Sequence, residues 1–127
     1  MAFERFTKTN ARGFVPKASI WSRGQIGFNQ SAVRKFEFNK YDYVVLFYDV
    51  ESKRIGIKLA NKNEEGVIKI SKKLASGGAS VSAKEFLFHY DINIPDTRNY
   101  DLAIDSDTGF LIIDTTKYKD RKKRSKQ

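Results

Sequence analysis

The chain has 127 residues, 40% of them hydrophobic, with no cysteine, one histidine and a formal net charge of +9. This length supports one domain with its own core, and the composition excludes disulfides, thiol catalysis and cysteine- or multi-histidine-ligated metal sites. No apolar run approaches the ~18 residues of a membrane-spanning helix, and the first residues carry no apolar signal region. We therefore expect a cytoplasmic protein with no membrane partner.

The positive charge is concentrated at the two ends of the chain. Residues 1–40 hold eight Lys or Arg against two acids, residues 41–114 hold nine against twelve, and residues 115–127 hold seven against one. Basic segments that flank a mildly acidic middle are typical of a protein that contacts a polyanion. Nucleic acid is favoured over anionic lipid because the basic C-terminal run has no apolar anchor. The alternative is that the tail only keeps the protein soluble.

The first quarter of the chain predicts an arm, a hairpin and a helix. Residues 1–17 mix aromatic and basic side chains without a period, which indicates an irregular N-terminal arm. Alternating apolar residues over 18–28, interrupted at Arg23-Gly24, predict a strand or a tight hairpin. Asn29 is the predicted cap of a short helix over residues 30–36.

The next segment predicts β structure. A β-branched and aromatic run over residues 41–50 is the strongest strand signal, and residues 54–59 return as its hairpin mate after a turn. A further strand is expected over residues 67–70, before the Gly77-Gly78 break.

After the break the same order of elements is predicted again. Residues 79–81 indicate a short strand, and Ser82 with Glu85 matches a capping box for a helix that ends at Tyr90. Residues 99–104 predict a strand, and residues 110–113 predict its hairpin partner.

The order and spacing of these elements indicate an internal repeat. We predict a single folded domain over residues 18–116, with repeat-like halves at 18–59 and 78–114, followed by a basic disordered tail over 117–127. The expected fold is α+β and mostly β: two tandem β-α-β-β units that form a small barrel or sheet with short helices. Phe36 and Tyr90 are the expected core residues at the two helix ends.

Residues 18–38, ASIWSRGQIGFNQSAVRKFEF, resemble the AbrB-like swapped-hairpin family of bacterial and archaeal transition-state regulators and antitoxins. The shared features are a basic strand, a Gly-Gln step, a second short strand and an amphipathic turn of helix. The resemblance covers about residues 18–59, with a weaker copy over 78–114, and departs from the family pattern at Asn29 and Glu37. It implies a DNA-binding transcriptional regulator or antitoxin-like protein that interleaves two units, either as a homodimer or within one chain.

The resemblance also implies DNA contacts by Arg23, Arg34 and Lys35. Arg23 precedes a glycine at a predicted kink, from which a guanidinium reaches phosphate or a guanine edge, and Gln25 beside it can read base edges. We expect Lys17, Arg34 and Lys35 to lie near the same face, although a solvated helix face also explains the last two. The predicted nucleic-acid-binding residues, with DNA favoured over RNA, are Arg12, Lys17, Trp21, Arg23, Gln25, Arg34, Lys35, Arg121, Lys122, Lys123 and Arg124.

Two other functions stay open. Phe3, Phe6, Phe14 and Trp21 interleave with cations in a pattern that would suit a single-stranded DNA or RNA binder, which stacks bases on aromatic rings. The same aromatic side chains could instead be buried in the sheet. The chain could also be a non-enzymatic structural or interaction protein, for example a phage-associated one.

Nothing in the sequence indicates catalysis. Asp107-Thr108-Gly109 matches an aspartic-protease triplet, but it follows the polar pair Asp105-Ser106, so a β-turn is the better interpretation. Gly77-Gly78 lacks the Lys-Ser/Thr of a phosphate-binding loop. We therefore expect no enzyme, no cofactor and no metal site.

Overall fold

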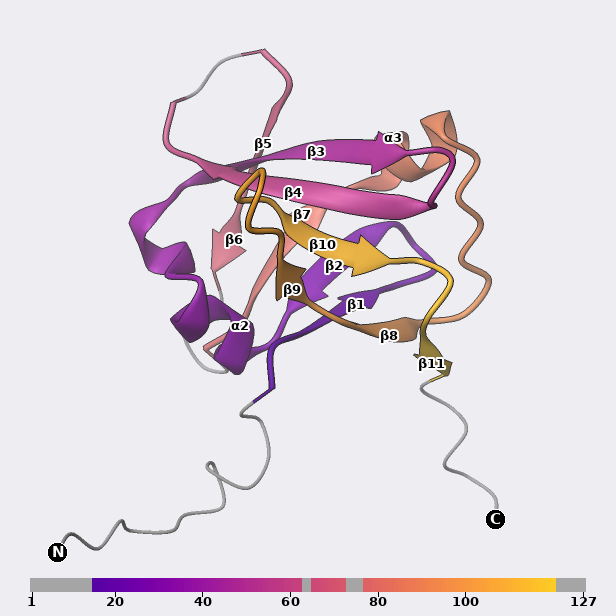
Figure 1. The fold of residues 1–127 in the computed structure, drawn as a ribbon, viewed down its shortest axis with the longest axis horizontal. Coiled ribbons are helices and arrows are strands. Elements are labelled where there is room, and N and C mark those ends of the chain that lie inside the picture. The colour runs from indigo at the N-terminus through magenta and orange to yellow at the C-terminus, as the bar shows by residue number, and fades with distance from the viewer. Residues whose placement is uncertain (1–14, 63–64, 73–76, 121–127) are drawn as a thin grey trace, which may run out of the picture.

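The computed structural model describes residues 15–62, 65–72 and 77–120, which form a mostly β fold of two antiparallel sheets and two short α-helices (Figure 1). Sheet A contains, in spatial order, β11 (Lys119–Asp120), β8 (Arg98–Asp101), β1 (Lys17–Ile20), β2 (Gln25–Phe28), β7 (Ala79–Ser82) and β6 (Ser71–Lys72). Sheet B contains β5 (Val67–Lys69), β3 (Tyr43–Asp49), β4 (Arg54–Ala60), β10 (Leu111–Asp114) and β9 (Ala103–Ile104). The helices are α2 (Gln30–Lys35), the 3-10 turn η1 (Phe38–Lys40) and α3 (Lys84–His89).

The strands form two open sheets over the described residues. Within residues 15–62, 65–72 and 77–120 no strand pairing joins sheet A to sheet B, so these strands do not form the closed barrel that was one of the two expected forms. The strands at the edges, β5, β6, β9 and β11, have only two or three residues each. Such short edges limit pairing with other chains.

One hydrophobic core lies between the two sheets. Period-two alternation turns Ile20 and Ile26 of sheet A and Ile55, Ile57 and Ile113 of sheet B inward, where each is 0% exposed. The helices close the core with apolar side chains from one face each: Ala32 and Val33 of α2 and Leu87 of α3.

The two helices begin differently. Asn29 caps α2 as predicted, because its side-chain oxygen accepts a hydrogen bond from the Ala32 N–H at 2.9 Å. The predicted capping box of α3 is wrong: the N-cap residue is Ala83, and no side chain caps the helix. The reason is that Ser82 stays in the extended β7 ladder, where it pairs with Gln25.

The single strand predicted over residues 99–104 is also wrong. The chain leaves sheet A at the end of β8 and enters sheet B at β9. Leu102 lies between them with a buried side chain, and its N–H donates to the Pro16 oxygen at 3.3 Å. Local β propensity favours a strand through the whole segment, but burial of Leu102 divides it between the two sheets.

Both ends of the described chain lie in sheet A. Lys17, predicted as part of the arm, is the first residue of β1, and residues 119–120, predicted as part of the disordered tail, form β11 beside β8. Tyr118 is fixed by contacts on its ring: the Arg98 guanidinium lies 3.9 Å from the ring centroid, and the Tyr100 ring lies 6.1 Å away. Residues 17 and 119–120 are therefore strand residues of sheet A.

Equivalent backbone conformations occur at the ends of the two helices. Phe36 (φ −99°, ψ 8°) and Tyr90 (φ −98°, ψ 10°) end α2 and α3, and the residues that follow, Glu37 and Asp91, both have φ 57°. The burial of the two aromatic side chains differs. Phe36 is half-buried against the core, whereas Tyr90 is 38% exposed, so the expected core position of Tyr90 is wrong.

Two hairpin turns, one in each half of the chain, are also closed by the same type of hydrogen bond. In the turn between β3 and β4 the Lys53 N–H donates to the Asp49 oxygen, and in the turn between β9 and β10 the Gly109 N–H donates to the Asp105 oxygen, both at 2.7 Å. Lys53 and Gly109 both adopt positive φ, at 59° and 78°. The Asp107-Thr108-Gly109 segment therefore belongs to a tight hairpin turn, closed by an i→i+4 bond in place of the i→i+3 bond of the predicted β-turn.

Candidate nucleic-acid interface

The outer face of sheet A, the face turned away from the core, carries small polar side chains. Because Ala18, Ile20, Ile26 and Phe28 point inward, the residues that alternate with them point outward. Strand register aligns one row of these residues across five strands: Ser71, Ser80, Gly27, Ser19 and Asn99. The Ser19 hydroxyl donates to the Asn99 side-chain oxygen at 2.6 Å. This row leaves space for larger groups to lie across the sheet.

Trp21 occupies that space. It follows β1 in the turn to β2, and a Cβ atom on Gly27 would lie 3.2 Å from ring atoms Cζ2 and Cη2 of Trp21. The absence of a side chain at Gly27 therefore lets the indole pack directly on β2. The turn is closed by two backbone hydrogen bonds, from the Trp21 N–H to the Gln25 oxygen and from the Gly24 N–H to the Trp21 oxygen.

Cations and an amide lie around this ring. The exposed Arg23 guanidinium is 5.7 Å from the Trp21 ring centroid, and half-buried Gln25 is the first residue of β2. Trp21, Ser22, Arg23 and Thr97 line a hollow of about 430 Å³. An aromatic face next to a guanidinium and an open hollow is an arrangement suited to stacking a planar ring.

Lys84 packs against Gly24 of the same turn and lines a separate hollow with Leu46, Val67 and Phe86, a position that the sequence patterns did not indicate. The Ala83 N–H donates to the Gly24 oxygen at 2.8 Å, which places the start of α3 against the turn. A Cβ atom on Gly24 would lie 2.7 Å from the Lys84 Cβ. We call Trp21, Arg23, Gln25 and Lys84 the Trp21 cluster. Lys84 was not predicted, because a contact between segments sixty residues apart leaves no local pattern in the sequence.

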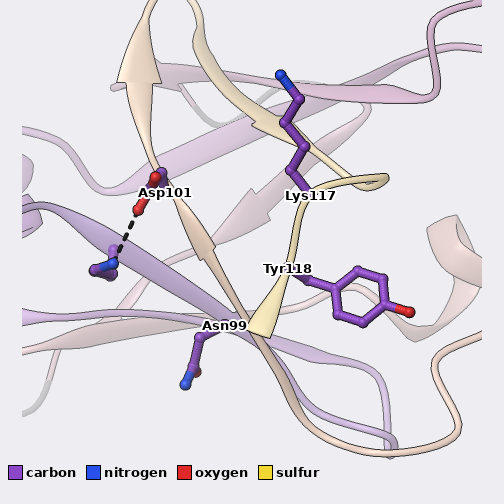
Figure 2. Close-up of a pocket in the computed structure, with 5 residues that line it drawn as sticks. Asn99, Asp101, Lys117 and Tyr118 are labelled. Carbon is purple, nitrogen blue, oxygen red and sulfur yellow. Dashed lines mark hydrogen bonds and ion pairs between the residues drawn. The ribbon is translucent and has the colours of Figure 1, made fainter. Parts of the chain in front are cut away.

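Lys17 lies at the other end of β1. Its ammonium forms an ion pair with Asp101 at 2.9 Å, which offsets its charge. Beside this pair lies a hollow of about 220 Å³ lined by Lys17, Asn99, Asp101, Lys117 and Tyr118. Figure 2 shows Asn99 and Asp101 on β8, with Lys117 and Tyr118 on the segment that leads into β11. Lys117 therefore adds a second cation at this edge of sheet A.

The exposed side chains of Arg34 and Lys35 do not join the Trp21 cluster. They lie in the last turn of α2, which follows the C-terminal end of β2 at Phe28. Arg23 precedes the N-terminal end of β2. Four strand residues span roughly 13 Å. The residues expected on one face are thus divided between the two ends of β2. Lys17 lies at the α2 end, where its backbone N–H donates to the Asn29 side-chain oxygen.

The remaining predicted cations, Arg12, Arg121, Lys122, Lys123 and Arg124, lie outside the described residues. The sequence gives residues 1–14 three cations and one acid, and residues 121–127 five cations and no acid. Both segments connect to sheet A, through β1 and β11.

Two further features concern metal ligands and membrane-spanning helices. No group of three or more potential metal ligands gathers in the described ranges, and His89 is exposed with its ring edge-on to Tyr90. No helix in the described part of the chain is long and apolar enough to cross a membrane. No protein-family model, curated protein or solved structure matches the chain.

Proposed function

We propose that the protein is a non-enzymatic, DNA-binding protein of the regulator or antitoxin type, which contacts DNA through the Trp21 cluster and the outer face of sheet A. The observation that carries this proposal is the cluster itself: Arg23 lies beside Trp21, Gln25 begins β2 on a small-residue sheet face, and Lys84 packs on Gly24 in the same turn. Cations that neutralise phosphates supply affinity, and an amide beside them can read base edges.

The charge of the terminal segments supports the same surface. Residues 1–14 and 121–127 together carry eight cations and one acid, and both are attached to strands of sheet A. Basic segments next to a binding face add affinity for any phosphate backbone, independent of sequence. Sheet A thus combines a structured contact with two basic extensions.

We further propose that the chain consists of two tandem β-α-β-β units, as the AbrB-like resemblance implies. Positions Glu37 and Asp91 lie 54 residues apart with the same φ, and the turns at Asp49 and Asp105 lie 56 residues apart with the same hydrogen bond. Adding 56 to the residue numbers of β3–β4 partners also reproduces the pairs between β9 and β10. The corresponding strands pair with each other inside each sheet, β2 with β7 and β4 with β10.

Reciprocal contacts support an approximate two-fold relation between these units. Gly24 lies against Lys84, the first residue of α3, and Gly77 lies against Gln30, the first residue of α2. Gln30 and Lys84 are 54 residues apart and are equivalent in the two units. The position against Gly77 therefore holds an amide, whereas the position against Gly24 holds a cation. On this basis only one of the two related sites has the charge to bind DNA.

Single-strand binding is the second candidate, and the position of Trp21 favours it. An indole on an outer sheet face offers a ring on which an unpaired base can stack, with Arg23 nearby for the phosphate. Stacking predicts a marked preference for single strands, whereas groove or phosphate contacts predict binding to duplex DNA.

The test is a fluorescence titration. The chain has one tryptophan, so its emission reports on the proposed site. Matched single- and double-stranded oligonucleotides are added at two salt concentrations. Saturable changes that weaken at high salt support the proposal, and the strand preference separates the two candidates. Lack of binding to either form at low salt would overturn both.

A further inference from the structure

A second hollow lies on sheet A, apart from the Trp21 cluster. It measures about 220 Å³, and its lining residues come from β1, β8 and the segment that leads into β11: Lys17, Asn99, Asp101, Lys117 and Tyr118 (Figure 2). We call it the Lys117 hollow. Two ammonium groups against one carboxylate leave it with one positive charge in excess. A hollow of this charge favours an anion.

The Lys117 hollow and the hollow beside Trp21 lie at the two ends of β1 on one face of the sheet. Ala18 and Ile20 point into the core, so Lys17, Ser19 and Trp21 fall on the outer face. Lys17 lines one hollow and Trp21 lines the other. Trp21 follows Lys17 by four residues, which is roughly 13 Å of extended chain. A ligand that extends beyond one stacked ring can therefore reach both.

The surface between the two hollows is formed by small side chains. Strand register aligns Ser19 with Gly27 on β2 and with Asn99 on β8. The Trp21 indole packs on Gly27, so the open part of this row is Ser19 and Asn99. The Ser19 hydroxyl donates to the Asn99 side-chain oxygen at 2.6 Å, which leaves the amide N–H groups of Asn99 as its donors. A phosphate backbone can follow β1 over these two small side chains.

The two cations of the Lys117 hollow differ in their partners. Lys17 pairs with Asp101 at 2.9 Å, but the Asp101 side chain is 82% exposed, and exposed pairs of this kind contribute little stability. A phosphate can therefore compete for the Lys17 ammonium. Lys117 is exposed and forms no ion pair within the described part of the chain. The hollow thus offers one cation directly and a second by exchange of its partner.

We propose that the Lys117 hollow is a second subsite of the nucleic-acid interface and takes a backbone phosphate. Such a subsite rests on the proposed function, since the same nucleic acid contacts the Trp21 cluster and then follows β1 to this hollow. The phosphate lies between the Lys17 and Lys117 ammonium groups and accepts a hydrogen bond from the Asn99 amide. Phosphate contacts of this kind position a backbone without reading its sequence. The subsite therefore adds affinity that is similar for all sequences.

Binding of the full chain to an end-labelled oligonucleotide, followed by fluorescence anisotropy at several salt concentrations, tests the subsite. The single- or double-stranded form that binds the wild type more tightly is used. Lys117→Gln should weaken binding at least about threefold and lower the slope of log affinity against log salt by about one. The matched control is Lys58→Gln, which removes an exposed cation from β4 in the other sheet and should change both values much less.

Asp101→Asn should act in the opposite direction. It removes the carboxylate that pairs with Lys17, so binding should tighten at least about twofold. Asp107→Asn is the matched control, because Asp107 is exposed in the turn between β9 and β10 of sheet B, and it should leave the affinity nearly unchanged. Weaker binding by Asp101→Asn, or an unchanged affinity and salt slope for Lys117→Gln, would overturn the subsite.

The combination of Lys117→Gln with Arg23→Ala separates this subsite from the Trp21 cluster. The two side chains lie at hollows on opposite ends of β1, so their fold losses should multiply, and a double variant no weaker than either single variant would contradict two separate contacts. Circular dichroism verifies that each variant is folded. If Arg23→Ala weakens binding and Lys117→Gln does not, the subsite is wrong while the proposed function stands. If the wild type binds neither form, both are wrong.

Discussion

The indole of Trp21 packs directly on Gly27, where an added Cβ atom would stand 3.2 Å from two of its ring carbons. This contact fixes an aromatic ring on the outer face of sheet A beside Arg23. A tryptophan that follows a strand would otherwise be free to turn toward solvent. The glycine in the neighbouring strand is therefore part of the proposed site, although it has no side chain to contact a ligand.

Gly27→Ala should displace that ring. The new methyl group requires the indole to move by a few tenths of an ångström, because the strand behind it is fixed by pairing on both sides. We expect a shift in Trp21 emission and weaker nucleic-acid binding. Gly56→Ala is the matched control, since its methyl group would meet Phe110 at the same 3.2 Å in the other sheet. Equal emission spectra for Gly27→Ala and wild type would contradict the packing described.

Gly24→Ala should destabilise the fold more than Gly109→Ala. Both glycines have positive φ, at 98° and 78°, so both substitutions carry the conformational cost of roughly 1–2 kcal/mol. Only Gly24 also faces a clash, with Lys84 Cα at 2.8 Å, whereas nothing lies within 4 Å at Gly109. Urea denaturation measures the difference. Similar losses for the two variants would indicate that α3 does not abut the turn.

Phe38→Ala should cost about 3–5 kcal/mol of unfolding free energy. Phe38 is 0% exposed, and its ring lies 4.8 Å from that of Phe28. Phe36→Ala should cost clearly less, because Phe36 is only half-buried. Thermal and urea unfolding of the pair give the comparison, and a larger loss for Phe36 would reverse the assignment of the core.

The free energy of unfolding should decrease in acid, because two carboxylates in turns become protonated. A side-chain hydrogen bond from Thr108 lowers the pKa of Asp105, and one from Thr116 lowers the pKa of Asp114, below the ordinary value of 3.8. A depressed pKa in the folded state stabilises the fold above the unfolded pKa, and that contribution disappears as the pH falls through the folded pKa. Urea midpoints at pH 7, 4 and 3 should therefore decline. Thr108→Val with Thr116→Val should flatten the decline, and an unchanged slope would argue against these bonds.

Local chemistry accounts for the features that the sequence predicted correctly. Asn29 caps α2 through a contact three residues away, and the Asp49 and Asp105 turns are closed by bonds within five residues. Trp21, Arg23 and Gln25 lie together because one turn contains all three. Such contacts depend on neighbours in the chain, so a pattern in the sequence is enough to indicate them.

Contacts between distant segments account for the errors. Ser82 is not a cap because β7 pairs with β2, and the strand over 99–104 divides because Leu102 is buried between two sheets. Arg34 and Lys35 were expected beside Arg23, but the length of β2 separates them. Lys84 enters the site through packing of α3 against Gly24. None of these relations has a local signature.

The basic C-terminal segment should contribute to affinity without defining the site. Deletion of residues 121–127 removes five cations. If they contact phosphates, the slope of log affinity against log salt should fall by several units, while Trp21 still responds to saturating oligonucleotide. An unchanged slope would show that this segment contacts no phosphate.

The central claim is that the Trp21 cluster forms the nucleic-acid interface, and a comparison of two double variants tests it most directly. Arg23→Ala with Lys84→Ala removes two cations from the cluster, whereas Arg34→Ala with Lys35→Ala removes two exposed cations from α2. Oligonucleotide affinity is measured for both at one low salt concentration. We expect the first variant to lose roughly 1–3 kcal/mol of binding free energy and the second to lose much less. An equal loss in both, or a larger loss in the α2 variant, would contradict the account.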